Sequence, residues 1–103
     1  MIVHCVFCRF LPDAPPDDIA DVLESLARFA QGLSGVQSVE VGPNRDFEGK
    51  SEGFGHGFII RLRDRAALEA YAVDPTHVAL GGRLCALCVG GADGIMVFDL
   101  EVS

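Results

Sequence analysis

The stretch YAVDPTH, residues 71–77, forces a break between two elements in the second half of this 103-residue chain. Pro75 has no backbone N–H and disfavours helical geometry at Asp74, so a helix that contains Tyr71 must end before the proline. We therefore expect Tyr71 on a helix and His77 just past its end, with both side chains able to point into one space. A phenol can donate a hydrogen bond and an imidazole can act as a base near neutral pH. The same spacing also fits an ordinary helix end with two amphipathic side chains.

The apolar pattern on either side of this break predicts a small α+β domain. Residues 17–31 repeat apolar side chains at i, i+3, i+4 and i+7, which indicates an amphipathic helix, and a second helix capped by Asp64 runs to Val73. Apolar runs and alternation predict strands at 2–10, 36–41, 54–63 and 95–102. The order β-α-β-β-α-β is the ferredoxin-like arrangement with a four-stranded antiparallel sheet. We expect a single domain over residues 1–103.

One face of that sheet has no helix to cover it. Two helices can cover only the other face, yet the first strand, the glycine-interrupted face of the third and the start of the fourth keep apolar residues on both sides. A monomer would expose a larger apolar patch than soluble monomers usually tolerate. The pattern therefore predicts a homodimer in which the sheets pack face to face.

The charge of the chain excludes two classes of partner. A formal net charge of −7 argues against nucleic acid and against anionic membrane surfaces, which would both repel the protein. No apolar run approaches the ~20 residues of a membrane-spanning helix. The N-terminus lacks the charged segment and cleavage site of a signal peptide, so we expect a cytoplasmic protein with reduced cysteines.

Several short motifs together resemble a known family. The first strand opens with His4, the third carries His56, and the break reads Tyr71-x-x-x-Pro75-x-His77-Val78; Gly42-Pro43-Asn44 and Val97-Phe98-Asp99 complete the set. Over nearly its whole length the chain resembles the stress-responsive α/β-barrel (dimeric α/β-barrel, Dabb) family. The resemblance implies a small homodimer whose two sheets form a barrel, in a family where most members have no assigned reaction.

One plant branch of that family, the olivetolic acid cyclase type, closes a linear polyketide by intramolecular aldol condensation without metal or organic cofactor. Its catalytic tyrosine and histidine match Tyr71 and His77, and His4 and His56 also fall on histidines of that enzyme. In this chemistry His77 would be the base and Tyr71 the donor to the developing enolate oxygen. The resemblance ends on the first helix, where the cyclase presents aromatic residues and this chain offers Val22, Leu23 and Leu26.

The histidines and cysteines do not predict a metal site. His4 and His56 lie toward opposite ends of neighbouring antiparallel strands, about 13 Å apart at the usual strand rise. We expect His56, rather than His4, beside Tyr71 and His77. An odd separation points the thiols of Cys5 and Cys8 to opposite faces of a strand, and two further thiols alone are not a site. We therefore expect buried cysteines, no metal and no cofactor.

Three hypotheses for the function follow. The first is a protein of unassigned reaction that binds a small apolar or aromatic molecule between sheet and helices. Tyr71 and His77 would form the polar end of this pocket, and its candidate walls are Val6, Cys8, Leu23, Leu26 and Phe58. The second is a cofactor-independent, polyketide cyclase-like enzyme that uses His77 and Tyr71. The third and weaker one is a cofactor-free monooxygenase, since other dimeric ferredoxin-like barrels oxidise aromatic polyketides.

Overall fold

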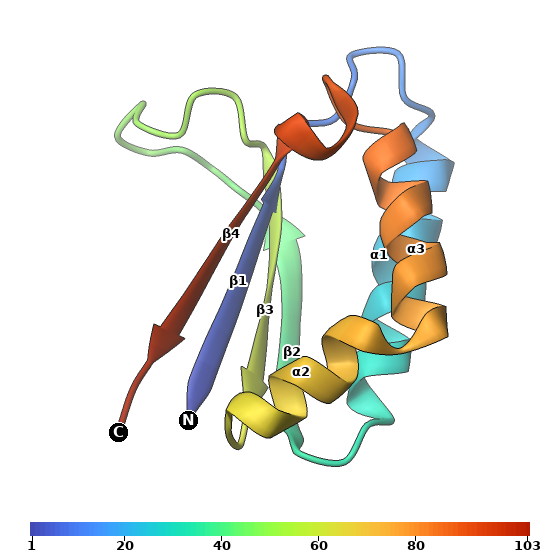
Figure 1. Cartoon of the computed structure of the whole chain (residues 1–103). Coiled ribbons are helices and arrows are strands. Elements are labelled where there is room, and N and C mark those ends of the chain that lie inside the picture. The colour runs from blue at the N-terminus through green and yellow to red at the C-terminus, as the bar shows by residue number, and fades with distance from the viewer.

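The computed structural model describes residues 1–103 as a sheet with one layer of helices against it (Figure 1). Its four strands form an antiparallel sheet in the order β2-β3-β1-β4, which confirms the predicted ferredoxin-like fold. The elements are β1 (Ile2–Cys8), α1 (Pro16–Gln31), β2 (Val36–Pro43), β3 (His56–Leu62), α2 (Arg65–Val73), α3 (Pro75–Ala86), the 3₁₀ turn η1 (Gly91–Gly94) and β4 (Ile95–Glu101). None of the helices combines the length and apolar character needed to cross a bilayer.

The predicted break at Pro75 is present, and it separates two helices, α2 and α3. Asp74 has extended backbone angles (φ −62°, ψ 130°), and its carboxylate accepts a hydrogen bond from the Thr76 N–H at 2.8 Å. Proline is well tolerated at the first position of a helix, where its missing N–H would have no partner. His77 therefore lies in the first turn of α3, a helix of 12 residues, where the sequence predicted only a position just past the end of a helix.

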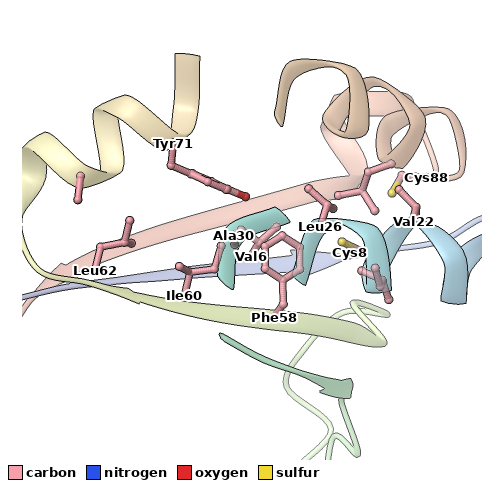
Figure 2. Close-up of a cluster of buried hydrophobic side chains, with 13 residues drawn as sticks. Val6, Cys8, Val22, Leu26, Ala30, Phe58, Ile60, Leu62, Tyr71 and Cys88 are labelled. Carbon is pink, nitrogen blue, oxygen red and sulfur yellow. The ribbon is translucent and has the colours of Figure 1, made fainter. Parts of the chain in front are cut away.

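The core lies between the helices and the sheet (Figure 2). The apolar face of α1 packs against alternate residues of β1 and β3. In the same layer α3 lies beside α1, and α2 lies at the end of the sheet where β3 ends (Figure 1). The most completely buried large side chains are Tyr71, Ile60, Leu62, Val22 and Cys8. Because Tyr71 is the largest of these, its ring is a structural member of the core as well as a candidate functional group.

The strand register decides which residues meet at each end of the sheet. Ile2 at the start of β1 pairs with Leu62 at the end of β3, and Cys8 pairs with His56. This confirms that the two strand histidines lie toward opposite ends. Because α2 begins directly after β3, it starts at the end of the sheet that holds His4, not at the end that holds His56.

The second face of the sheet carries no helix (Figure 1). Along β4, Met96, Phe98 and Leu100 point to this face and are 40%, 50% and 52% exposed. The ring of Phe7 packs over Gly57, where an added Cβ would lie 2.7 Å from the ring. The glycine in β3 is therefore required by the aromatic side chain of its partner strand, and the face as a whole remains apolar and open.

Candidate functional site

A cavity of about 310 Å³ lies between the sheet and the helices at the end where α2 meets α3. Its walls are mainly apolar side chains from every layer of the fold. The three side chains with polar ring or hydroxyl atoms are His4 from β1, Tyr71 from α2 and His77 from α3. The apolar wall includes Val6, Leu26, Phe58, Leu68, Val78, Leu84, Ile95 and Val97. This is the place where the break at residues 71–77 gathers its two functional groups.

Tyr71 is the central polar residue of the cavity. Its ring reaches from α2 into the layer between helices and sheet (Figure 2), and the residue is 1% exposed. The hydroxyl has no hydrogen-bond partner in the protein. Burial raises the pKa of the phenol from 10.0 to about 12, because the charged phenolate cannot be solvated there. The hydroxyl is therefore a neutral donor that lacks an acceptor.

His77 lies against Tyr71 with its tautomer fixed by the backbone. The two ring centroids are 4.3 Å apart, and the His77 Nδ1 lies 3.0 Å from the carbonyl oxygen of Ala72. Since a carbonyl only accepts, Nδ1 must carry the hydrogen and donate it. The Nε2 atom then keeps its lone pair, so His77 is prepared to accept a proton or a hydrogen bond.

A second imidazole approaches Tyr71 from the sheet. His4 meets the tyrosine edge to face with a centroid distance of 5.7 Å, and its Nδ1 lies 2.5 Å from Oδ1 of Asp99. The two residues are cross-strand partners on β1 and β4. The His4 side chain is only 12% exposed, so the carboxylate fixes its orientation and leaves Nε2 as the free nitrogen.

Three of the residues predicted for this site lie elsewhere. The prediction that His56 neighbours Tyr71 and His77 is wrong, because α2 leaves the opposite end of β3. His56 instead packs its ring 5.1 Å from Phe10 and lines a second cavity, of about 590 Å³, together with Leu23. Cys8 is fully buried in the core and reaches neither cavity. The predicted walls Val6, Leu26 and Phe58 do lie in the cavity with Tyr71.

Asp99, Gly81 and Cys85 bear on the chemistry of this region and were not among the site residues predicted from the sequence. Asp99 holds His4, and the other two line the cavity. Gly81 and Cys85 lie on α3 four and eight residues after His77, about one and two turns further along the same face. A helix prediction for residues 75–86 would therefore have found both. The pairing of β1 with β4 would have found Asp99.

Three of the four cysteines are buried, and Cys85 is partly exposed. All four are free thiols. Burial, and then the neighbouring Cys88, raises the pKa of Cys8 to about 12, and burial likewise raises the pKa of Cys88. No set of three or more histidine, cysteine, aspartate or glutamate side chains is placed to hold a metal ion.

The sequence matches the family of the Stress responsive A/B Barrel Domain (Dabb) over residues 2–102. The chain belongs to this family. A protein of unknown function from Jannaschia sp. CCS1, described as dimeric and ferredoxin-like, is 46% identical; the alignment covers 98% of both chains and the TM-score is 0.91.

Two similar structures carry the name of a reaction. Hydroxynitrile lyase from Passiflora edulis is 14% identical with a TM-score of 0.84, and 99% of this chain and 93% of that chain are covered. An antibiotic biosynthesis monooxygenase is 14% identical with a TM-score of 0.80, over 100% of this chain and 99% of that chain. At these identities the likeness shows the fold alone. No curated protein matches the sequence.

The burial of Tyr71 predicts a measurable pH dependence. It is the only tyrosine and the chain has no tryptophan, so the phenolate absorbance of the native protein reports this residue alone. We expect that band to appear with a midpoint near pH 12 in the folded protein and near 10.0 after denaturation. Because folding raises this pKa, the buried phenol contributes its full stabilisation below pH 10.0. That stabilisation is lost as the pH rises from 10.0 to about 12. Over this pH range, the free energy of unfolding of the wild type should fall by about 3 kcal/mol relative to that of Tyr71→Phe, as measured by unfolding at several pH values. A native midpoint near 10.0 would contradict the buried phenol.

Proposed function

We propose that the cavity binds a small apolar or aromatic molecule that carries an oxygen acceptor. The observation that supports this most directly is the Tyr71 hydroxyl, which is buried in an apolar cavity without a partner. An unsatisfied buried hydroxyl costs about 1–3 kcal/mol. A ligand carbonyl or hydroxyl oxygen beside Tyr71 would remove that cost, while the rest of the ligand contacts the apolar wall.

The dimensions of the site restrict the ligand. A volume of about 310 Å³ is at the lower end of the range for small-molecule pockets. Part of this space lies in front of Gly81, where an added Cβ would meet no atom within 4 Å. A larger side chain at this position would begin in open space and extend into the volume that the ligand needs.

This proposal can be tested with a simple probe, methyl heptyl ketone. Its carbonyl can accept from Tyr71 and its chain matches the apolar wall, so we expect saturable quenching of the Tyr71 fluorescence. Gly81→Leu should weaken binding at least about tenfold because the leucine fills the cavity. In a calorimetric titration, Tyr71→Phe should weaken binding by about 1 kcal/mol, the value of a typical hydrogen bond.

The chain provides a matched control for the glycine substitution. Gly82 is the next residue of the same helix, is exposed, and also has no atom within 4 Å of an added Cβ, but it does not line the cavity. Gly82→Leu should therefore leave ketone binding unchanged. Equal loss in both variants, or quenching that rises linearly with ketone concentration, would refute the site.

We also propose that two copies associate through the open face of the sheet. The exposed residues Met96, Phe98 and Leu100 supply an apolar surface of the kind that monomers seldom leave in water. The protein from Jannaschia sp. CCS1, at 46% identity, is described as dimeric, which supports a dimer here.

Sedimentation tests the dimer. Wild type should sediment as a dimer at micromolar concentration, and Phe98→Glu should weaken association by more than about thirtyfold, because a charge replaces a central aromatic contact. Val73→Glu is the control, since Val73 is 75% exposed but lies in α2 on the helical side. A monomeric wild type, or a Val73→Glu variant that dissociates as well as Phe98→Glu, would reject the sheet-face dimer.

A second candidate is cofactor-independent enolisation of the polyketide cyclase type. The observation that favours it is the bond from His77 Nδ1 to the Ala72 carbonyl, which leaves Nε2 as a base. In this scheme Nε2 removes a proton from a methylene between two carbonyls, and the Tyr71 hydroxyl donates to the oxygen on which enolate charge develops. The enolate carbon then attacks a third carbonyl further along the same chain, and the imidazolium returns the proton to the new alkoxide. Asp99 positions His4 at the edge of Tyr71. The weaker monooxygenase alternative has support from fold likeness only.

Hydrogen–deuterium exchange separates a binder from an enzyme. Ethyl butyrylacetate carries an activated methylene. In heavy water its methylene protons exchange for deuterium, and the decay of their proton NMR signal gives the exchange rate. If His77 is a base, His77→Gln should reduce the protein-catalysed exchange rate by about a hundredfold or more. His56→Gln is the control, since His56 lies in the other cavity. Exchange that is no faster with wild type than with His77→Gln would leave binding as the function and remove His77 as a base.

A further inference from the structure

We propose that Cys85 is a covalent capture site for apolar α,β-unsaturated carbonyl compounds that enter the cavity. The inference rests on the proposed function, since the molecule must first be bound there. It adds a chemical class of ligand and a reactive residue, neither of which depends on whether His77 acts as a base.

Only one of the four cysteines is placed for such a reaction. Cys85 lines the cavity and is partly exposed, whereas Cys8 and Cys88 are buried in the core. Cys5 is also buried, and the alternation of β1 points it to the open face of the sheet, away from the cavity. A molecule in the cavity therefore meets a single thiol.

The position of Cys85 on α3 sets the length of the site. His77, Gly81 and Cys85 follow at intervals of four residues and so lie on one face of the helix. The eight residues from His77 to Cys85 correspond to about 12 Å along the axis. The cavity therefore extends from the polar end formed by Tyr71 and His77, past the open space at Gly81, to the thiol.

An independent observation indicates that this space holds a ligand. Tyr71 is 1% exposed and its side chain lines the same cavity, and its buried hydroxyl has no partner in the protein. A chain with an oxygen atom near Tyr71 and an activated double bond near Cys85 would satisfy this hydroxyl and fill the apolar middle.

The reaction is a conjugate addition and needs no oxidant or second reactant. The thiolate sulfur of Cys85 bonds to the β-carbon, and the π electrons of the double bond move toward the carbonyl oxygen to give an enolate. The proton that the thiol released returns to the α-carbon, so the net change is addition of S–H across the double bond. Selectivity comes from holding the β-carbon beside the sulfur, which raises its effective concentration. The raised pKa values of Cys8 and Cys88 keep those thiols protonated and less reactive.

The test compares two enals with the same reactive group. The first is 9-hydroxynon-2-enal, called nonenal below, whose apolar chain carries an oxygen at its far end for Tyr71, and the second is acrolein, which has neither chain nor distal oxygen. The adducts are counted residue by residue by mass spectrometry on the folded, full-length protein. We expect the rate of nonenal addition at Cys85 to saturate with concentration and to exceed that in the denatured protein at least about tenfold, whereas acrolein shows no such acceleration. Methyl heptyl ketone should compete, Gly81→Leu should slow capture about tenfold, and Gly82→Leu should not. Cys85→Ser should abolish the saturable adduct, while Cys5→Ser leaves it unchanged.

The outcomes separate this inference from the proposal it rests on. If the ketone binds with the expected dependence on Gly81 but nonenal reacts at Cys85 without saturation, or reacts first at His77 or Cys5, the capture site is refuted and the binding function stands. If the ketone does not bind, the binding function fails, and the capture site fails with it.

Discussion

The turn at Asp74 and Pro75 is the constraint on which the site depends. If α2 continued as a straight helix, residues 71 and 77 would be six positions apart and would point in directions about 120° apart around its axis. The extended backbone of Asp74 stops α2, and its carboxylate starts α3 by accepting the Thr76 N–H. The first turn of the new helix then brings the ring of His77 to 4.3 Å from that of Tyr71. One capped, proline-started helix therefore converts two distant ring systems into a pair.

The antiparallel register supplies the rest of the polar end, and here the sequence was only partly informative. The antiparallel pairing of the first and third strands, expected from the ferredoxin-like order, correctly placed His4 and His56 toward opposite ends of the sheet. Alternation shows only which residues share a face, so the partnership of His4 with Asp99 also needed the register between β1 and β4, which periodicity does not give. The first half of the site was accessible from local rules, and the second half needed the order of the strands.

The misplacement of His56 has a geometric cause. A helix following β3 was expected to return toward the start of that strand and so to approach His56. With nine residues, however, α2 is only about 14 Å long, shorter than the seven-residue strand at about 23 Å. Tyr71 therefore stays near the end of β3, and α3 makes the return. The sequence signal for α3 was weak because of its two adjacent glycines, each of which lowers helix propensity by about 1 kcal/mol relative to alanine.

Gly81 and the hydroxyl of Tyr71 are both unusual features of the cavity, but they differ in how strongly they indicate a ligand. Gly81 is unfavourable in a helix interior, but Gly82 has the same cost and faces solvent, so the glycine alone does not distinguish a ligand site from a weak helix. The hydroxyl of Tyr71 has no such duplicate. Phenylalanine would fill the core equally well, since the ring and not the hydroxyl makes the contacts with Phe29, His4 and His77. A protein that needed only packing here would be at least as stable without that oxygen. The buried, unpartnered hydroxyl is therefore the feature that stability does not explain, and the proposed ligand's oxygen would lie beside it, at the end of the cavity where both imidazoles contact Tyr71.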